Sequence, residues 1–351
     1  MIVLGIESSC DETAAAIVRE DGQVLADVVR SQVATHAPFG GVVPEIAARD
    51  HMRAIVPVVL EALGTAGLQL KDVDAVAVTH RPGLIGALLV GVQAAKGLAW
   101  AAERPLVGVD HLVGHLLSPF LVRDGVEASR PEFPFIGLLV SGGHSALYRC
   151  DGPAAEQIRE LGATRDDAVG EAFDKVSKLL GLGYPGGPVI DRLAARGDRT
   201  RGLALTAPMA QRDSLELSFS GLKSAIARHV ESHEVQGEDA LADLCASFQD
   251  VVVGTLVRKT LCAARLEGVA NVVIAGGVAC NRQLRASMAE ACAGRGLAFF
   301  APHPRNCTDN AAMIAYAGAM KLARGVVSGL DLAPLTRTEL PRVTRKGRGQ
   351  R

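Results

Sequence analysis

The sequence lacks any pair of cysteines at C-x-x-C spacing, and its seven cysteines are scattered along 351 residues. An odd, scattered set of this kind argues against a disulfide framework and against a zinc ribbon. Free thiols are typical of a reducing compartment. We therefore expect a cytoplasmic protein.

The sequence also lacks the segments that direct a chain into or across a membrane. The opening MIVLGIESSCDET has six residues before Glu7, with neither the basic start nor the long apolar centre of a secretory signal. The apolar stretch from Leu84 to Ala102 is interrupted by Gln93 and Lys96, and it does not reach the roughly 20 apolar residues of a membrane span. We expect neither export nor a membrane segment.

An excess of positive charge is absent as well. The formal net charge is −1, so the chain as a whole does not attract a polyphosphate, and any contact with nucleic acid needs a local patch or a partner protein. The tail from Arg337 to Arg351 has six basic residues and one acidic residue. It is either an ordinary solvated tail or an arm that follows phosphate groups.

The composition indicates a compact α/β protein with two lobes. Apolar residues make up 48% of the chain and charged residues 21%, enough for a large core, and the length exceeds one typical domain. The polar, proline-bearing segment 122–134 predicts a boundary. We expect an N-terminal lobe at 1–130, a C-terminal lobe at 131–325 and a basic tail at 326–351.

Two segments of the sequence share one pattern of apolar and polar residues. Residues 1–18 and 135–149 each contain an apolar run, a short polar turn and a second apolar run, a pattern that predicts a β-hairpin. The repeat indicates two similar lobes. Between and after the hairpins, the periodicity predicts helices at 43–63, 84–101 and from Leu241 to Gly268, and strands at 74–79 and from Asn271.

Three turns after apolar strands are poor in bulky side chains: Ser8 to Thr13, Ser141 to Ser145 and Gly276 to Asn281. Glycine lets a ligand approach the backbone, and successive N–H groups form an anion site without basic side chains. The turns match neither G-x-x-x-x-G-K-[ST] nor G-x-G-x-x-G. They favour a nucleotide-binding cleft of another kind, although three merely tight turns would give the same pattern.

A candidate metal site lies in the segment DHLVGH. His111 and His115 are four residues apart, so on a helix both side chains lie on one face and can bind one ion. A third ligand can come from Asp309, in a polar loop before an alanine-rich segment. The competing interpretation is that Asp309 or Thr308 simply caps that helix.

The segment from Gly170 to Pro188 is dense in residues that can contact a ligand. Its glycines and prolines fix a loop that can lie against a sugar or base, and Asp174 and Asp191 can accept hydrogen bonds from ribose hydroxyls. A rigid turn is the simpler interpretation of PGGP.

The motifs ESSCDETAAAI, GGVVPEIAARDH, HLVGH, LLVSGGHS, GEAFDKVSKLLGLGYPGGP, FSGLK, GGVACN and CTDNAAMIA occur in this order. In this the chain resembles the TsaD family of tRNA N6-adenosine threonylcarbamoyltransferases. The resemblance implies an actin-like, sugar-kinase-like ATPase fold of two α/β lobes, with mixed sheets flanked by helices.

The resemblance also implies the reaction. A threonylcarbamoyl group passes from threonylcarbamoyl-AMP to N6 of the adenosine 3′ of the anticodon, in tRNAs that read codons beginning with A, and AMP leaves. The implied partners are tRNA, homologues of TsaB and TsaE, and a TsaC-type enzyme that makes the adenylate.

The family's functional residues are carried over by position. His111, His115 and Asp309 match metal ligands, with Fe2+ the usual ion and zinc also bound. The positions that match contacts to the adenylate, to ATP or to the substrate are Val140, Ser141, Gly142, Gly143, His144, Asp174, Gly187, Asp191 and Asn281. Asp11 and Glu12 in the first turn are candidates for the general base.

Two other functions remain open from the residues alone. A zinc metallopeptidase would need a glutamate after the first histidine, as in H-E-x-x-H, but Leu112 occupies that position. A nucleotide-binding scaffold or a small-molecule kinase of the same fold would not depend on tRNA.

Overall fold

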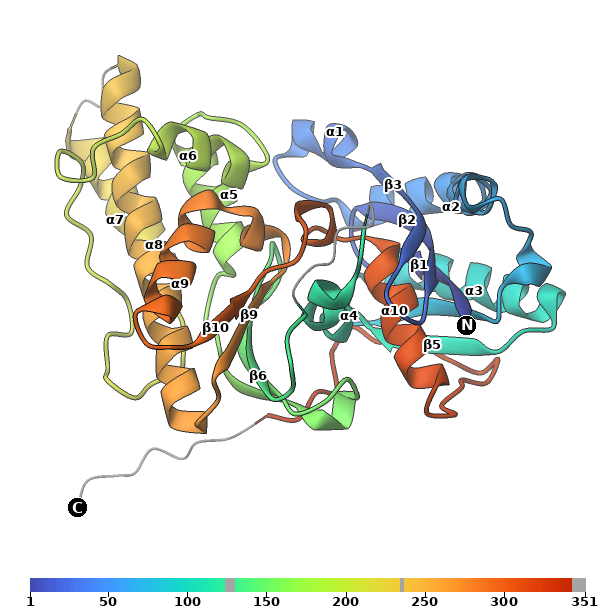
Figure 1. Ribbon diagram of the computed structural model, residues 1–351. Coiled ribbons are helices and arrows are strands. Elements are labelled where there is room, and N and C mark those ends of the chain that lie inside the picture. The colour runs from blue at the N-terminus through green and yellow to red at the C-terminus, as the bar shows by residue number, and fades with distance from the viewer. Residues whose placement is uncertain (124–129, 234–236, 343–351) are drawn as a thin grey trace.

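The computed structural model describes residues 1–123, 130–233 and 237–342, which form two lobes side by side (Figure 1). Each lobe is built on a five-stranded mixed sheet with helices against it, so the predicted α/β class is confirmed. Residues 124–129 of the predicted boundary segment and residues 343–351 of the basic tail lie outside the described residues.

The first sheet has the order β3-β2-β1-β4-β5. Strands β1, β2 and β3 form an antiparallel meander, and β4 and β5 extend the sheet parallel to β1. Helices cover both faces, which is why the central strands are almost continuously apolar. The bounds are β1 (Ile2–Glu7), β2 (Glu12–Arg19), β3 (Val24–Ser31), β4 (Ala75–Arg81) and β5 (Leu106–Asp110).

The second sheet repeats this topology, with the order β10-β9-β6-β7-β8. Strand β6 takes the place of β1, β7 and β8 follow it antiparallel, and β9 and β10 continue in parallel. The two predicted hairpins and the similarity of the lobes are therefore confirmed. The bounds are β6 (Phe135–Val140), β7 (Ser145–Cys150), β8 (Ile158–Ala163), β9 (Asn271–Ala275) and β10 (Ala298–Phe300).

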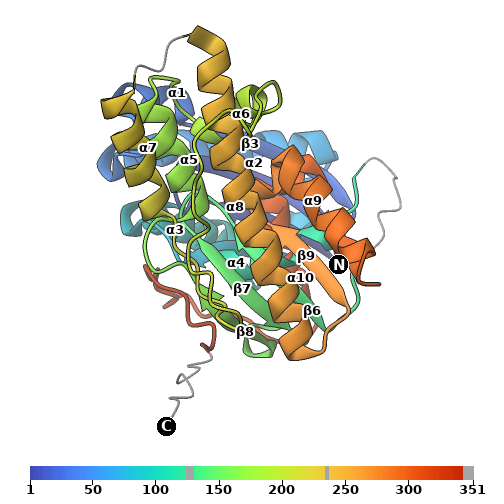
Figure 2. The same cartoon turned by 90° about the vertical axis from the view of Figure 1, so that its left-hand side faces the viewer.

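Helices lie outside each sheet and between the two sheets (Figures 1 and 2). The outer helices of the first lobe are α2 (Pro44–Ala66) and α3 (Ile85–Ala102), with the short α1 (Val33–His36) beside them. Those of the second lobe are α5 (Val169–Leu179), α6 (Gly186–Ala194), α7 (Ser220–Ser232), α8 (Gly237–Glu267) and α9 (Arg282–Ala293). Between the sheets lie α4 (His111–Leu117) and α10 (Ala311–Leu322). Single 3-10 turns occupy Ala37–Phe39, Leu70–Asp72, Ser118–Phe120, Ala155–Gln157, Gly277–Cys280 and Pro304–Asn306.

The alternation of side chains along β1 produces this layering. Leu4 and Ile6 join the core beneath α2 and α3, whereas Val3 joins the core between the sheets, which α4 and α10 also line. Residues i and i+2 of a strand face one side of its sheet, so one strand supplies two separate cores.

Helix α10 returns the chain to the first lobe. It falls within the range expected for the second lobe, 131–325, but it packs on β1, β2 and β4. The approach is close, because a Cβ on Gly5 would collide with the backbone of Ala311 and Ala315. Glycine in β1 and alanine in α10 thus fix the start of α10 against the first sheet.

The described part of the tail also spans both lobes. The Ser328 amide donates to the Leu106 carbonyl at 2.8 Å, the Leu335 amide donates to the His80 carbonyl at 2.8 Å, and the Glu160 amide donates to the Pro341 carbonyl at 2.7 Å. Residues 326–342 are therefore held against the protein rather than extended into solvent.

In the part of the chain that the structure describes, two helices, α3 and α8, are long and apolar enough to cross a membrane by length and composition alone. Helix α8 is mostly buried against α6, α9 and the second sheet, as a core helix is. Helix α3 packs on β4 and α2, with 33% of its apolar window buried.

Candidate functional site

The candidate site lies where the parallel strands of both sheets end. Glu7 is the last residue of β1, Asp110 of β5 and Val140 of β6. Ligands of open α/β sheets bind beyond the carboxyl ends of the strands, because the loops that leave those ends can diverge and open a crevice.

Helix α4 orients the two histidines. The Asp110 carboxylate caps it by accepting from the Leu112 amide at 3.0 Å, so the helix starts directly at the end of β5. His111 and His115 then lie one turn apart on the same face, with ring centroids 4.6 Å apart and planes at 86°. Both side chains are buried.

Asp309 precedes α10 but does not cap it. The cap is Asn310, whose side-chain oxygen accepts from the Met313 amide at 3.0 Å, so the capping role considered for Asp309 or Thr308 is wrong. The Asp309 carboxylate instead faces the histidines, with Oδ1 at 3.0 Å from His115 Nε2 and 3.5 Å from His111 Nε2.

The three side chains form a group that can hold a metal ion. One ligand atom from each of His111, His115 and Asp309 lies within 4.8 Å of the other two. The Asp309 side chain remains 22% exposed, so the group opens towards solvent. Two imidazoles and one carboxylate leave coordination positions for a substrate.

Glu7 is a residue of the site that the sequence analysis missed. It is fully buried, and its Oε2 lies 2.9 Å from His111 Nδ1. Its carboxylate also accepts from the Ser9 amide at 2.5 Å and from Thr79 Oγ1 at 2.6 Å. A carboxylate behind a ligating histidine fixes the orientation of the ring, which leaves Nε2 for the ion.

The charges of the group fit a cation. Burial opposes protonation of His111, but the carboxylates of Glu7 and Asp309 outweigh it and raise the pKa of His111 well above its usual value. Burial lowers the pKa of His115, and its Nδ1 has no hydrogen-bond partner among the described residues. A site that favours a positive charge between two carboxylates and presents neutral imidazole nitrogen suits a divalent metal ion.

The β6–β7 turn brings the predicted phosphate loop beside the histidines. Val140 ends β6, and Ser141 closes the turn by accepting at its Oγ from the His144 amide at 3.1 Å. Burial, with the nearby His111 and His115, lowers the pKa of His144 to about 4, so this imidazole is neutral near pH 7.

The same turn is open on its outer side. A Cβ added to Gly142 or Gly143 would meet nothing within 4 Å. Behind it, Gly276 packs on the Val140 carbonyl with φ +88°, a conformation and a contact that only glycine permits. The glycines therefore leave the backbone of the turn accessible to a ligand.

Asp11 lies in the β1–β2 turn, and Glu12 is the first residue of β2. Burial, with Asp309 and Asp11 nearby, raises the pKa of Glu12 to about 9. The negative charge of Asp11 also contributes to the raised pKa of Asp174 in the second lobe, whose largest cause is burial. The two lobes thus face each other here.

The other predicted substrate positions lie on α5, α6 and the start of α9. Asp174 accepts from the Gly186 amide at 2.7 Å, and Gly187 is open to solvent on its side-chain face. Asn281 caps α9 through the Leu284 amide and donates to Asp191 Oδ1 at 3.2 Å. The structure therefore brings Asp191 and Asn281 together and holds Asp174 near Gly187.

The fold is shared with solved structures of low sequence identity. Component A of the (R)-2-hydroxyglutaryl-CoA dehydratase of Acidaminococcus fermentans aligns with a TM-score of 0.52 and 17% identity, over 92% of this chain and 99% of that one. HypF of T. kodakarensis aligns with a TM-score of 0.59 and 15% identity, over 92% of this chain and 48% of that one. The actin-like, sugar-kinase-like fold is thereby confirmed.

Curated relatives match over the whole chain. A protein of Sorangium cellulosum is 67% identical over 100% of both chains, and one of Geobacter metallireducens is 52% identical over 95% of this chain and 96% of its own. Both are named tRNA N6-adenosine threonylcarbamoyltransferase. The model of the TsaD family, described by the same words, matches residues 23–316. This chain therefore belongs to the TsaD family of tRNA N6-adenosine threonylcarbamoyltransferases.

Proposed function

We propose that the crevice between the two lobes binds threonylcarbamoyl-AMP and transfers its threonylcarbamoyl group to N6 of the adenosine 3′ of a tRNA anticodon, releasing AMP. The observation that carries this assignment to the crevice is the convergence of His111, His115 and Asp309 beside the open β6–β7 turn. The family match supports the reaction class.

His111, His115 and Asp309 are the residues that would hold the ion, with Glu7 orienting His111. We assign Fe2+ as the first candidate and zinc as the second. When bound, such an ion would polarise the carbamoyl carbonyl as a Lewis acid.

The backbone of the β6–β7 turn would hold the phosphate of the adenylate. The residues from Val140 to His144 present a turn without bulky side chains on its outer face, and His144 stays neutral beside it. Backbone N–H groups can stabilise a departing phosphate without proton transfer. AMP is then a good leaving group, and no covalent enzyme intermediate is required.

The nucleoside would lie against α5 and α6. Asp174 uses Oδ1 for the Gly186 amide, which leaves Oδ2 to accept from a ribose hydroxyl. Asp191 is held by Asn281 at 3.2 Å and by Arg282 at 2.8 Å, and Gly187 leaves room for the ligand. Threonylcarbamoyl-AMP and ATP share the adenosine that these residues would bind.

Attack by the adenosine N6 on the carbamoyl carbon releases a proton, which Asp11 or Glu12 would receive. Asp11 lies in the turn before β2, close enough to α5 for its charge to affect Asp174, and Glu12 begins β2. Glu12 carries a proton of its own near pH 7, because burial raises its pKa to about 9, and this favours Asp11 as the base.

The proposed protein partners are homologues of TsaB and TsaE, and a TsaC-type enzyme would supply the adenylate in the cytoplasm. An apolar face of α2 and α3 supports a docking partner of the TsaB kind. Met52, Val56 and Leu60 lie at four-residue spacing along α2 and are 60% or more exposed. On α3, Ile85, Leu89 and Trp100 extend this apolar face. Exposed apolar patches of this sort mark protein interfaces.

The test combines the purified chain with its TsaB and TsaE partners, threonylcarbamoyl-AMP and unmodified tRNA, followed by mass spectrometry of the digested nucleosides. We expect a threonylcarbamoyl mass gain on adenosine that requires both the donor and tRNA. A folded, metal-loaded enzyme that gives no gain, but consumes ATP without tRNA, would indicate a kinase or a nucleotide-binding scaffold instead.

A further inference from the structure

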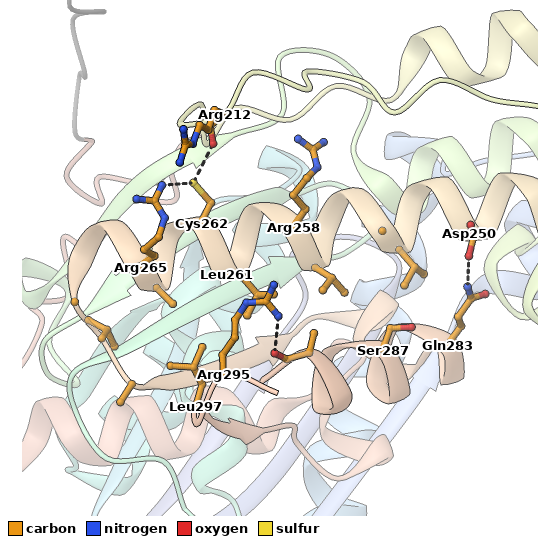
Figure 3. A pocket seen from close by; sticks show the side chains of 18 residues that line it. Arg212, Asp250, Arg258, Leu261, Cys262, Arg265, Gln283, Ser287, Arg295 and Leu297 are labelled. Carbon is orange, nitrogen blue, oxygen red and sulfur yellow. Dashed lines mark hydrogen bonds between the residues drawn. The ribbon is translucent and has the colours of Figure 1, made fainter. Parts of the chain in front are cut away.

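A basic groove runs along the outside of the second lobe, between α8, α9 and the loop before α7 (Figure 3). It encloses about 850 Å³. Its floor is aliphatic, from residues such as Val253, Val257 and Leu261 on α8 and Leu297 before β10. It follows α8 from Asp250 to Gly268, about 27 Å at the rise of an α-helix.

Four arginines stand around this groove, against one carboxylate. Arg258 and Arg265 belong to α8, Arg212 to the loop before α7, and Arg295 follows α9 (Figure 3). The carboxylate, Asp250, is already bound by Arg199 at 2.7 Å and by Gln283 at 3.2 Å. The groove is therefore strongly positive on a chain whose net charge is −1.

Most of this positive charge has no counter-charge. Arg265 pairs with Asp213 at 2.5 Å. Within the described residues, Arg258 and Arg295 donate only to the carbonyls of Pro208 and Ala291, and the Arg212 guanidinium has no partner. A guanidinium bound only to a carbonyl, or to water, remains free to bind a phosphate.

The groove connects with the proposed nucleoside site. Gln283 lines both the groove and a smaller hollow of about 380 Å³ beside Asp191. Gln249 donates to Asp191 at 3.2 Å and to Gln283 at 3.0 Å, which links the two walls. The groove thus lies next to Asp191, a residue of the proposed nucleoside site.

We propose that the groove binds the sugar-phosphate backbone of the tRNA whose adenosine reacts in the crevice. Phosphate recognition needs a local concentration of positive charge when the whole protein has none, and these arginines provide it. The inference rests on the proposed function for the identity of the RNA. The aliphatic floor would lie against ribose carbons. An acidic polypeptide is the alternative occupant.

The test measures the affinity of the full-length chain for an unmodified tRNA transcript by fluorescence anisotropy, at several concentrations of KCl and without the acyl donor. The variant combines Arg212→Gln with Arg295→Gln, neither of which pairs with a carboxylate. We expect affinity to fall about tenfold or more. The slope of log K against log salt should become shallower by about 1 to 2, because binding releases fewer counterions when two phosphate contacts are lost. KM for tRNA should rise while kcat at saturating tRNA stays unchanged.

The matched control combines Arg19→Gln with Arg104→Gln, which removes the same number of positive charges from two exposed arginines of the first lobe. It should leave affinity and slope unchanged, and circular dichroism should show all variants folded. Wild-type affinity and slope in the double variant would overturn the proposal. Loss of binding to poly-glutamate with tRNA binding intact would also overturn it, in favour of a polypeptide. If the wild-type chain binds tRNA but modifies nothing, the proposed function fails while the groove stands.

Discussion

At the scale of single residues, Glu7 determines the orientation of the His111 imidazole ring. The carboxylate is buried at the end of β1, accepts from the Ser9 amide and Thr79, and lies 2.9 Å from His111 Nδ1. The far nitrogen of the ring thereby faces Asp309. The negative charge of Glu7 also offsets that of a bound cation.

Replacing Glu7 by glutamine keeps the shape of the side chain but removes its charge and one acceptor. We expect metal affinity to fall by between about 10-fold and 100-fold, as is typical for residues behind a metal ligand. Transfer activity should fall with it and recover partly at high metal concentration. Equilibrium dialysis against Fe2+ or Zn2+ measures the effect.

Glu61→Gln is the control, because Glu61 is an exposed carboxylate on the outer helix α2 and lies away from the candidate metal group. Equal metal affinity in wild type and Glu7→Gln, with Glu61→Gln also unchanged, would show that Glu7 does not orient the site.

The sequence predicted the three ligand positions but not the residues around them. His111 and His115 follow from helical spacing, since residues four apart share a face. Glu7 was missed because it is 104 residues from His111 in the chain, and only the ends of β1 and β5 bring the two together. Asn310 was not expected as the cap, because it is adjacent to Asp309 and aspartate caps helices about as well as asparagine.

At the scale of elements, the contact between β1 and α10 sets the distance between Glu7 and Asp309. Glu7 ends β1 and Asp309 lies two residues before α10, so any shift between the two elements moves these carboxylates relative to each other. Gly5 permits the contact, because a Cβ there would collide with the backbone of α10.

Gly5→Ala should therefore lower the free energy of unfolding by about 1–3 kcal/mol, the usual cost of overpacking, and weaken metal binding together with it. Gly97→Ala is the control. Gly97 lies in α3, a Cβ there would meet nothing within 4 Å, and alanine in a helix should stabilise by up to about 1 kcal/mol. Urea unfolding of both variants measures the difference, and a Gly5→Ala protein as stable as wild type would contradict the tight contact.

The helices and hairpins were predictable, but the position of α10 was not. Periodicity of 3.6 residues predicted α2, α3 and α8, and apolar runs around short turns predicted both hairpins. Helix α10 is rich in alanine and buried on most sides, so the order of its apolar residues does not predict which sheet it packs on. Its place on the first lobe follows from two close contacts that only glycine allows: Gly5 of β1 against the start of α10, and Gly318 of α10 against Ala77 of β4.

At the scale of the whole molecule, the surface divides into regions with different physical properties. The first lobe presents an apolar face on α2 and α3, and the second lobe presents a groove with four arginines. A net charge of −1 hides this division, because the positive groove is balanced by acids elsewhere. The sequence predicted the need for a local basic patch, but placed it only in the tail.

The apolar face should carry the TsaB-type partner. Val56→Asp places a charge between Met52 and Leu60 in the apolar face of α2. Because a charge buried without a partner at an interface is costly, we expect the complex with the partner to be lost. Size-exclusion chromatography with light scattering measures the complex. Val327→Asp, at a valine that is 55% exposed outside this face, is the matched control and should leave the complex intact. Partner binding that survives Val56→Asp would place the interface elsewhere.

We propose that His111, His115 and Asp309 hold the ion on which threonylcarbamoyl transfer depends. The most direct measurement compares wild type with Asp309→Asn, which removes a charge but keeps the size of the side chain. Metal content is determined by elemental mass spectrometry, and digested tRNA nucleosides are determined by mass spectrometry in the same preparations. We predict that metal falls from about one ion per chain to almost none, and that threonylcarbamoyl-adenosine disappears, while circular dichroism stays that of the folded protein. Normal amounts of threonylcarbamoyl-adenosine from a metal-free Asp309→Asn enzyme would contradict the claim.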